Sequence, residues 1–153
     1  MGLDMYLSGV NSDGSLTAVA YWRKANAIHG WFVRNVQDGI DQCQKSPATR
    51  EQLQKLLQVC EEVSKSIQLI DGYVYNGMHL GPDTGGQLVT DYIEGQVIAE
   101  PEIAEKLLPT QEGFFFGSVA YDQWYYEDVE NTIKMIKDAL NSDFQEFVYQ
   151  SSW

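Results

Sequence analysis

Residues 49–67, TREQLQKLLQVCEEVSKSI, hold the clearest helix signal in the chain. The hydroxyl of Thr49 can accept a hydrogen bond from the amide of Gln52 while the Gln52 side chain bonds back to Thr49, which is a capping box. Apolar residues then recur three or four positions apart and form one side of a helix. The stretch predicts an amphipathic helix that is followed by a turn at Asp71 and Gly72. The predicted buried side consists of Leu53, Leu56, Leu57, Cys60, Val63 and Ile67.

Four other segments also have helical spacing or helix-boundary residues. Apolar residues repeat at helical intervals between residues 19 and 36 and again between residues 122 and 140, where charged residues fill the opposite side. Pro101 at a first helical position predicts a short helix over residues 101–108. Phe144, Phe147 and Val148 are spaced as in a further helical turn or two in the tail.

Strand signals lie at the start of the chain and in its middle. Residues 3–7 alternate in part between apolar and polar side chains, and a turn-rich stretch follows them. Residues 87–92 and 96–99 are rich in strand-forming side chains and are separated by Glu94 and Gly95. This pattern predicts a hairpin or a small antiparallel sheet.

These elements together predict an α+β fold in which three to four main helices pack with a small antiparallel sheet. A chain of 153 residues is close to the usual size of one domain. Its 44% of apolar and 21% of charged residues are typical of a globular protein. Because the sequence shows no repeat and no linker, we expect one globular domain over residues 1–153.

The chain is strongly acidic, with a formal net charge of −12. Residues 1–50 carry five basic and four acidic side chains, so residues 51–153 carry −13. This charge argues against direct binding to nucleic acid or to anionic membranes, which requires clustered Lys and Arg. Two interpretations stay open: an acidic face that binds a basic partner, or a well-solvated surface that keeps the protein soluble. The oligomeric state is not predicted.

The sequence contains neither a run of about 18 apolar residues nor the basic and apolar regions of a signal peptide. We therefore expect a cytoplasmic protein. Cys43 and Cys60 lack CxxC spacing and predict free thiols in a reducing compartment. The common signatures of hydrolases, nucleotide triphosphatases, zinc proteases and dinucleotide enzymes are absent, so no cofactor or metal is predicted and an enzyme is the less favoured class.

Residues 21–32, YWRKANAIHGWF, concentrate side chains that can recognise a small molecule. Trp or Tyr rings can stack on a base, and Arg23 can donate charge-assisted hydrogen bonds to an anion such as a nucleotide phosphate. The alternative is an amphipathic helix that buries its aromatic residues and exposes Arg and Lys. A catalytic interpretation would need a partner for His29, and we consider Asp122 for that role.

Three ordered motifs resemble a family of small uncharacterised proteins encoded by bacteriophages and prophages. They are residues 1–7 (MGLDMYL), residues 20–33 (AYWRKANAIHGWFV) and residues 107–128, which include LLPT, GFFFGS and YYED. The match weakens over residues 8–17 and 72–91. The resemblance implies a phage accessory protein that acts in the cytoplasm of the bacterial host.

For such a protein the leading hypothesis is a host-modulating or anti-defence inhibitor whose acidic face covers a host protein, including one that binds nucleic acid. The alternative is a protein that binds or sequesters a small nucleotide-type ligand. We expect a ligand cleft between the first and last helices, and an acidic partner-binding face at Glu127, Asp128 and Glu130. The ligand-binding candidates are Trp22, Arg23, Asn26, His29, Trp31, Phe116, Asp122 and Tyr126.

Overall fold

A computed structural model describes residues 2–82 and 85–153 of the chain. Within these residues it shows four helices and two antiparallel sheets, which confirms the predicted α+β class. The elements are β1 (Asp4–Val10), β2 (Leu16–Arg23), α1 (Asn26–Asn35), β3 (Ser46–Thr49), α2 (Arg50–Ser66), β4 (Gln68–Leu80), β5 (Leu88–Ala99), α3 (Glu102–Leu107), α4 (Gln123–Asn141) and β6 (Glu146–Ser152).

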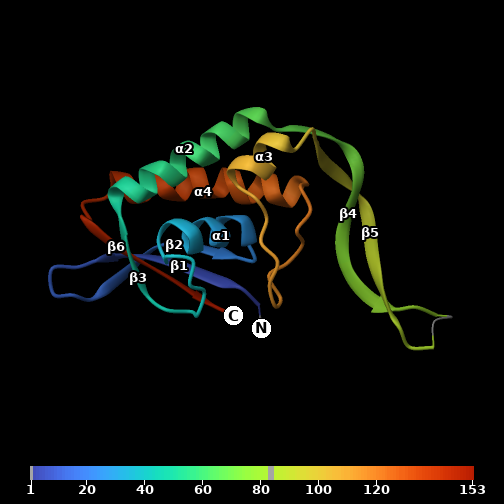
Figure 1. Cartoon of the computed structure of the whole chain (residues 1–153), viewed down its shortest axis with the longest axis horizontal. Coiled ribbons are helices and arrows are strands. Elements are labelled where there is room, and N and C mark those ends of the chain that lie inside the picture. The colour runs from blue at the N-terminus through green and yellow to red at the C-terminus, as the bar shows by residue number, and fades with distance from the viewer. Residues whose placement is uncertain (1, 83–84) are drawn as a thin grey trace.

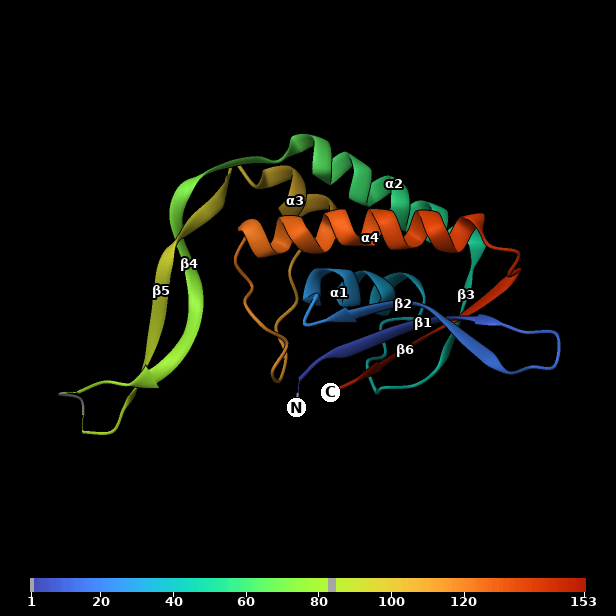
Figure 2. The ribbon, with the colours of Figure 1, turned by 180° about the vertical axis from the view of Figure 1, so that it is seen from behind.

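The larger sheet has the strand order β2-β1-β6-β3, and all its neighbouring strands are antiparallel. Helix α1 lies between this sheet and the layer formed by α2, α3 and α4 in both ribbon views (Figures 1 and 2). The core fills the space between strands and helices, and its largest fully buried side chains include Phe32, Leu56, Ile136, Phe147 and Tyr149.

The prediction of a helical tail is wrong, because residues 146–152 form strand β6 in the middle of the sheet. Phe147, Tyr149 and Ser151 are buried and alternate with more exposed neighbours, which is the period of a strand. The strand pairs with β1 on one side and with β3 on the other. These pairings come from distant parts of the chain and override the local spacing of the aromatic residues.

The helix predicted over residues 19–36 begins only at Asn26, and residues 16–23 form strand β2 instead. Ala20 and Trp22 are buried on one side of this strand, and Tyr21 between them is exposed. Strand and helix are separated at Lys24, whose φ of 55° lies in the left-handed region and interrupts both conformations.

Helix α2 matches its prediction closely. Both hydrogen bonds of the capping box between Thr49 and Gln52 are present, and Leu53, Leu56, Cys60 and Val63 are buried. Helix α4 also begins as predicted, after Asp122 at its N-cap, and packs against α2. No helix in the described part of the chain is long and apolar enough to cross a membrane.

Strands β4 and β5 form a long hairpin, called the arm below, that projects away from the rest of the molecule (Figures 1 and 2). The turns predicted at Asp71-Gly72 and Glu94-Gly95 are wrong, since both pairs lie inside strands and Gly72 faces Gly95 across the hairpin. Close packing explains these glycines. A Cβ on Gly72 would lie 2.9 Å from Cγ2 of Val97, and one on Gly95 would lie 2.7 Å from Oε1 of Gln123.

The base of the arm is tied to the start of α4. Val97 forms a β-bridge with Asp122, and the amide of Ile98 donates a hydrogen bond of 3.0 Å to the carbonyl of Tyr121. The amide of Gln96 donates to Oε1 of Gln123 over 2.7 Å. The arm is therefore held by backbone and side-chain contacts to the residues that begin the last helix.

Replacing Thr49 with alanine removes the oxygen that accepts the Gln52 amide. We expect Thr49→Ala to lower the free energy of unfolding by about 1 kcal/mol, measured by urea denaturation. Thr49→Ser keeps the hydroxyl and is expected to retain most of that stability. Equal unfolding midpoints for the alanine variant and the unmodified protein would contradict a stabilising role for this cap.

Candidate functional site

A cleft of about 340 Å³ lies where the end of β2, the start of α4, the loop before α4 and the arm meet. Its basic side chains come from the end of β2, and its acidic side chains come from α4 and its N-cap. Tyr75 extends the lining onto the arm. The lining residues are Arg23, Lys24, Asn26, Ala27, Tyr75, Thr110, Gly117, Ser118, Ala120, Asp122, Trp124, Tyr125, Glu127 and Asp128.

Asp122 is the most deeply buried carboxylate of the cleft, with 2% of its surface exposed. Its Oδ1 accepts hydrogen bonds from the amides of Trp124 at 3.0 Å and Tyr125 at 3.2 Å and so caps α4. Its Oδ2 is buried and has no partner. Burial raises the pKa of this carboxyl even though the two amides act in the opposite direction.

Asp128 lines the same cleft from the second turn of α4. Burial raises the pKa of its carboxyl to about 7, and the negative charges of Glu127 and Asp122 add to this effect. Burial therefore favours the protonated form of Asp122 and Asp128, and among the described residues no Lys or Arg forms an ion pair with either carboxyl.

The basic side of the cleft is formed by Arg23 and Lys24. Arg23 makes a long contact of 3.7 Å with Asp4, and its side chain is 55% exposed. The amide of Lys24 donates to the carbonyl of Leu3 over 2.7 Å, which fixes the turn between β2 and α1. Among the described residues, neither Arg23 nor Lys24 forms an ion pair with a carboxylate of the cleft.

Asn26 organises the loop that forms one wall of the cleft. Its Nδ2 donates to the carbonyls of Phe116 at 3.1 Å and Ser118 at 2.8 Å, and its Oδ1 accepts from the amide of Gln111 at 3.0 Å. These bonds hold the loop beside the first turn of α1. Residues 21–32 and the loop with three phenylalanines therefore lie side by side in the structure.

Phe116 is the buried member of that loop and packs edge-on against the ring of His29, with ring centres 5.3 Å apart. Phe114 and Phe115 are exposed. One of the three rings of this apolar segment is therefore buried in the core.

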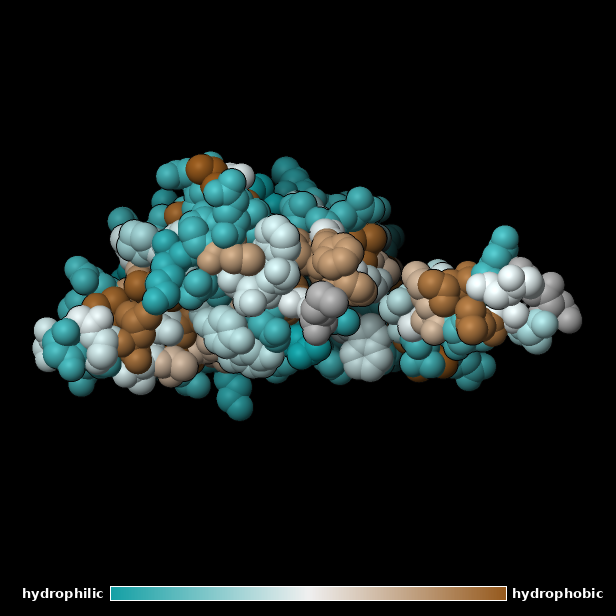
Figure 3. Space-filling model, turned by 90° about the horizontal axis from the view of Figure 1, so that it is seen from below, coloured by the Kyte–Doolittle hydropathy of each residue, from teal (hydrophilic) through white to brown (hydrophobic). Residues whose placement is uncertain are grey.

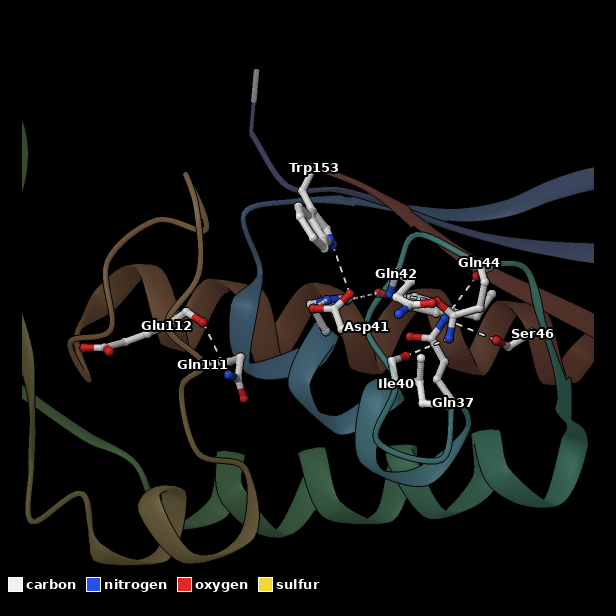
Figure 4. Close-up of polar contacts among 11 residues, drawn as sticks. Gln37, Ile40, Asp41, Gln42, Gln44, Ser46, Gln111, Glu112 and Trp153 are labelled. Atoms are coloured by element: carbon white, nitrogen blue, oxygen red, sulfur yellow. Dashed lines mark hydrogen bonds and ion pairs between the residues drawn. The ribbon is translucent and has the colours of Figure 1, made fainter.

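His29 belongs to an enclosed network away from the cleft. Its Nε2 lies 2.9 Å from Oδ2 of Asp41, and its Nδ1 lies 2.7 Å from the hydroxyl of Tyr149. The other oxygen of Asp41 accepts a hydrogen bond of 2.9 Å from the indole of Trp153 (Figure 4). Because both ring nitrogens of His29 are engaged here, the hypothesis that pairs His29 with Asp122 in catalysis is wrong.

The loop that carries Asp41 to His29 is fixed by its own glutamines. Nε2 of Gln37 donates to the carbonyl of Gln44 at 3.1 Å and to Oγ of Ser46 at 3.2 Å (Figure 4). Gln44 in turn donates to the carbonyl of Ile40 over 2.6 Å. These contacts hold the loop that brings the partly exposed Asp41 to the buried ring of His29.

The structure brings Arg23, Asn26 and Asp122 of the predicted ligand-binding residues to the cleft. Trp22 and Trp31 are buried in the core, where the indole of Trp22 donates to Oγ1 of Thr132 over 2.9 Å. His29 and Phe116 are buried as described above. Tyr126 does not line the cleft.

The three acidic residues predicted to bind a partner, Glu127, Asp128 and Glu130, all lie on α4. Glu130 accepts a hydrogen bond from the hydroxyl of Ser64 on α2. Glu127 and Asp128 line the cleft instead. Of these three residues, one therefore contacts the neighbouring helix α2 and two form part of the cleft wall.

The arm carries a surface that the sequence patterns did not identify. Residues 68–99 contain four acidic side chains and no Lys or Arg. The sequence alone therefore indicated that this segment is acidic along its whole length. Large apolar side chains are exposed along the arm at Ile70, Tyr73, Met78, Leu80, Leu88, Val89, Tyr92 and Ile93.

One face of the arm joins the cleft. Tyr73 pairs with Glu94 and Tyr75 pairs with Tyr92, so these four side chains lie on the same side of the hairpin. Tyr75, Met78 and Tyr92 also line a groove of about 860 Å³ between the arm and residues 112–119. In the view from below, the arm stands apart from the body across a hollow and shows apolar residues beside polar ones (Figure 3).

The raised pKa of Asp128 predicts a pH-dependent stability. Between about pH 4 and pH 7 the folded protein keeps a proton on this carboxyl that the unfolded chain has released, so stability falls as the pH rises through 7. We expect Asp128→Asn to raise the free energy of unfolding by roughly 1–3 kcal/mol at pH 8 and to change it little near pH 4.

Urea denaturation at the two pH values checks this expectation. Glu62→Gln, at an exposed position on α2, removes the same charge outside the cleft and is the matched control. An Asp128→Asn effect of equal size at both pH values would show that the carboxyl does not retain its proton.

The three motifs behind the phage resemblance meet beside the cleft. The carbonyl of Leu3 accepts from the amide of Lys24, and the amide of Leu3 donates to the carbonyl of Phe115 over 3.4 Å. Comparison of the chain with protein-family models, curated proteins and solved structures found no match. The relation to phage proteins therefore stays a prediction from the sequence motifs.

Proposed function

We propose that this chain is an accessory protein that acts by binding a basic partner protein through its arm. The observation that carries the proposal is the combination of exposed apolar side chains and uncompensated acidic charge on one projecting hairpin. Exposed apolar patches on this scale mark interaction sites in soluble proteins. The contacts of Gln96, Val97 and Ile98 hold the base of the arm to the body and leave the large apolar side chains along the arm exposed.

The charge of the arm selects the kind of partner. Asp71 and Glu94 are exposed, and within the described residues neither forms an ion pair. Asp91 contacts His79, with Oδ2 and Nδ1 3.0 Å apart. A second acidic copy of this chain would be repelled by these groups, whereas a segment rich in Lys and Arg would be attracted.

Two exposed tyrosines of the arm would make the binding of a basic segment more specific. Tyr73 and Tyr92 are 68% and 62% exposed and lie on the same face as Glu94. Tyrosine is enriched among the residues that dominate binding energy at protein interfaces, and its ring can stack with an arginine whose charge pairs with a nearby carboxylate. An extended partner segment can also pair with the open outer edges of the hairpin.

The biological setting is part of the proposal. The motif resemblance supports a phage-encoded protein in the cytoplasm of a bacterial host, where a basic surface on a host protein that binds nucleic acid is a suitable target. Covering such a surface would inhibit that protein and so modulate the host or its defence. The protein would act here as a binding protein without chemistry of its own.

Removing two carboxylates from the arm is expected to weaken partner binding. We expect the double variant Asp71→Asn/Glu94→Gln, immobilised and exposed to bacterial lysate, to retain basic proteins at least about tenfold less than the unmodified chain. Retention by the unmodified chain is expected to fall as salt rises from roughly 0.05 to 0.5 M. Quantitative mass spectrometry of the retained proteins provides the measurement.

Glu62→Gln/Asp138→Asn is the matched control, because it removes two exposed carboxylates from the helical layer and gives the same net charge. This control is expected to retain the same proteins as the unmodified chain. Equal losses in the two double variants would mean that net charge, and not the arm, causes retention, and the proposal would then fail.

A further inference from the structure

In the described part of the chain, helices cover the larger sheet on one side only. Both ribbon views place α1 and the layer of α2, α3 and α4 on the same side of this sheet (Figures 1 and 2). The other side is seen from below in Figure 3, where white and brown residues lie among teal ones across the body. The uncovered face of an antiparallel sheet normally turns polar side chains to water, so apolar residues here need an explanation.

The uncovered face, called the outer face below, carries large apolar side chains. Its residues alternate along each strand with the buried residues of the core, and the strand register aligns them across the sheet. Tyr21, Tyr6 and Leu16 expose 49%, 42% and 41% of their surface. Val10 and Val148 are half-buried members of the same face.

Few charges lie on the outer face. Strands β1, β2, β3 and β6, all within the described residues, contain three charged side chains, which are Asp4, Arg23 and Glu146. Two acidic groups and one basic group give these strands −1, which leaves −11 of the net −12 for the rest of the chain. Two copies of this acidic chain therefore repel each other least when their outer faces meet.

The size of the side chains changes along the outer face. Tyr6 and Tyr21 are paired near one end of the sheet, with ring centres 5.4 Å apart. Val10 and Leu16 are paired at the opposite end, and the small Ser8 lies between the two pairs on β1. A second outer face turned end for end places its aliphatic pair over this aromatic pair, and the reverse. The face therefore complements itself in size, as the inner faces of a β-sandwich complement each other.

Opposite charges lie at the two ends of the outer face. Arg23 pairs with Asp4, and Asp4 pairs with Ser152 at the end of β6, whereas Glu146 begins that strand at the opposite end. Arg23 and Glu146 are both exposed. A two-fold axis that crosses the strands in the middle of the face exchanges the two ends, so Arg23 of each copy comes toward Glu146 of the other.

The same axis keeps the acidic arms apart. Tyr75 of the arm and Arg23 line one cleft, so the arm stands at the Arg23 end of the sheet. When the ends are exchanged, the two arms lie at opposite ends of the pair. Copies stacked in the same direction would bring both acidic arms together and would repel each other.

We propose that the outer face binds a second copy of this chain in a two-fold symmetric dimer, with the two sheets packed face to face. Such a contact uses the same residues of both copies. Burial of the aromatic and aliphatic side chains stabilises it, and the two pairs of Arg23 with Glu146 set its orientation. The contact lies on the sheet of the body and does not depend on the arm binding a partner protein.

Other occupants fit the outer face less well. A basic protein would find only the carboxylates of Asp4 and Glu146, and Asp4 already contacts Arg23. Single-stranded nucleic acid stacks on exposed aromatic rings, but its phosphates need several cations. The four strands offer one cation, at Arg23.

Analytical ultracentrifugation of the purified full chain tests the proposal. At roughly 0.1 mM chain we expect the mass of two chains. Tyr6→Glu adds a carboxylate from each copy to the contact and is expected to raise the dissociation constant of the dimer at least about tenfold. Gln54→Glu, at an exposed position of α2, adds the same charge away from the sheet and is expected to leave the dimer unchanged.

An exchange of charges tests the two-fold arrangement. Arg23→Glu and Glu146→Arg each place like charges opposite each other, and each is expected to weaken the dimer at least about fivefold. The double variant restores opposite charges without changing the net charge, so its dissociation constant is expected to return to within about twofold of the unmodified value. Circular dichroism verifies the fold of every variant.

A monomeric mass at about 1 mM chain would overturn the dimer, and so would a dimer that folded Tyr6→Glu leaves unchanged. A double variant weaker than both single variants would overturn the two-fold arrangement. A chain that stays monomeric but captures a bacterial protein, and loses it in Tyr6→Glu, would assign the outer face to that protein instead of a second copy.

Discussion

The burial of Asp122 constrains three parts of the molecule at once. Its backbone bridges Val97 at the base of the arm, its Oδ1 caps α4, and its Oδ2 is buried without a partner in a residue that lines the cleft. Without an acceptor at this position, the amides of Trp124 and Tyr125 would lose their partner. One carboxylate therefore links the start of the last helix, the base of the arm and the acidic side of the cleft.

The parts of the fold that depend on neighbouring residues were predictable from sequence. Helix α2 follows from the bonds between Thr49 and Gln52 and from its apolar spacing, and α4 follows from the apolar residues that repeat at helical intervals between residues 122 and 140. Strands β2 and β6 were missed because their partners lie far away in the chain. Trp22 and Phe147 fit helical spacing as well as strand alternation, and only the pairing with β1 decides between the two.

The site residues were also predictable only in part, because the sequence gives the chemistry of each side chain but not which side of its strand or helix faces the core. Residue chemistry and the motif resemblance together identified Arg23, Asn26 and Asp122, but they could not separate these residues from Trp22 and His29, which face the packed interior. That separation depends on which side of β2 and α1 faces the core. The acidic arm could be identified from another feature of the sequence, since residues 68–99 contain no Lys or Arg.

The cleft and the arm share structural elements, so their occupants would influence each other. Tyr75 lines both the cleft and the groove beside the arm, and Gln123, next to Asp122, packs against Gly95 of the arm. A ligand that contacts Tyr75 therefore contacts part of the partner-binding surface. If that ligand changes the affinity of the arm for its partner by some factor, the partner must change the affinity of the cleft for the ligand by the same factor.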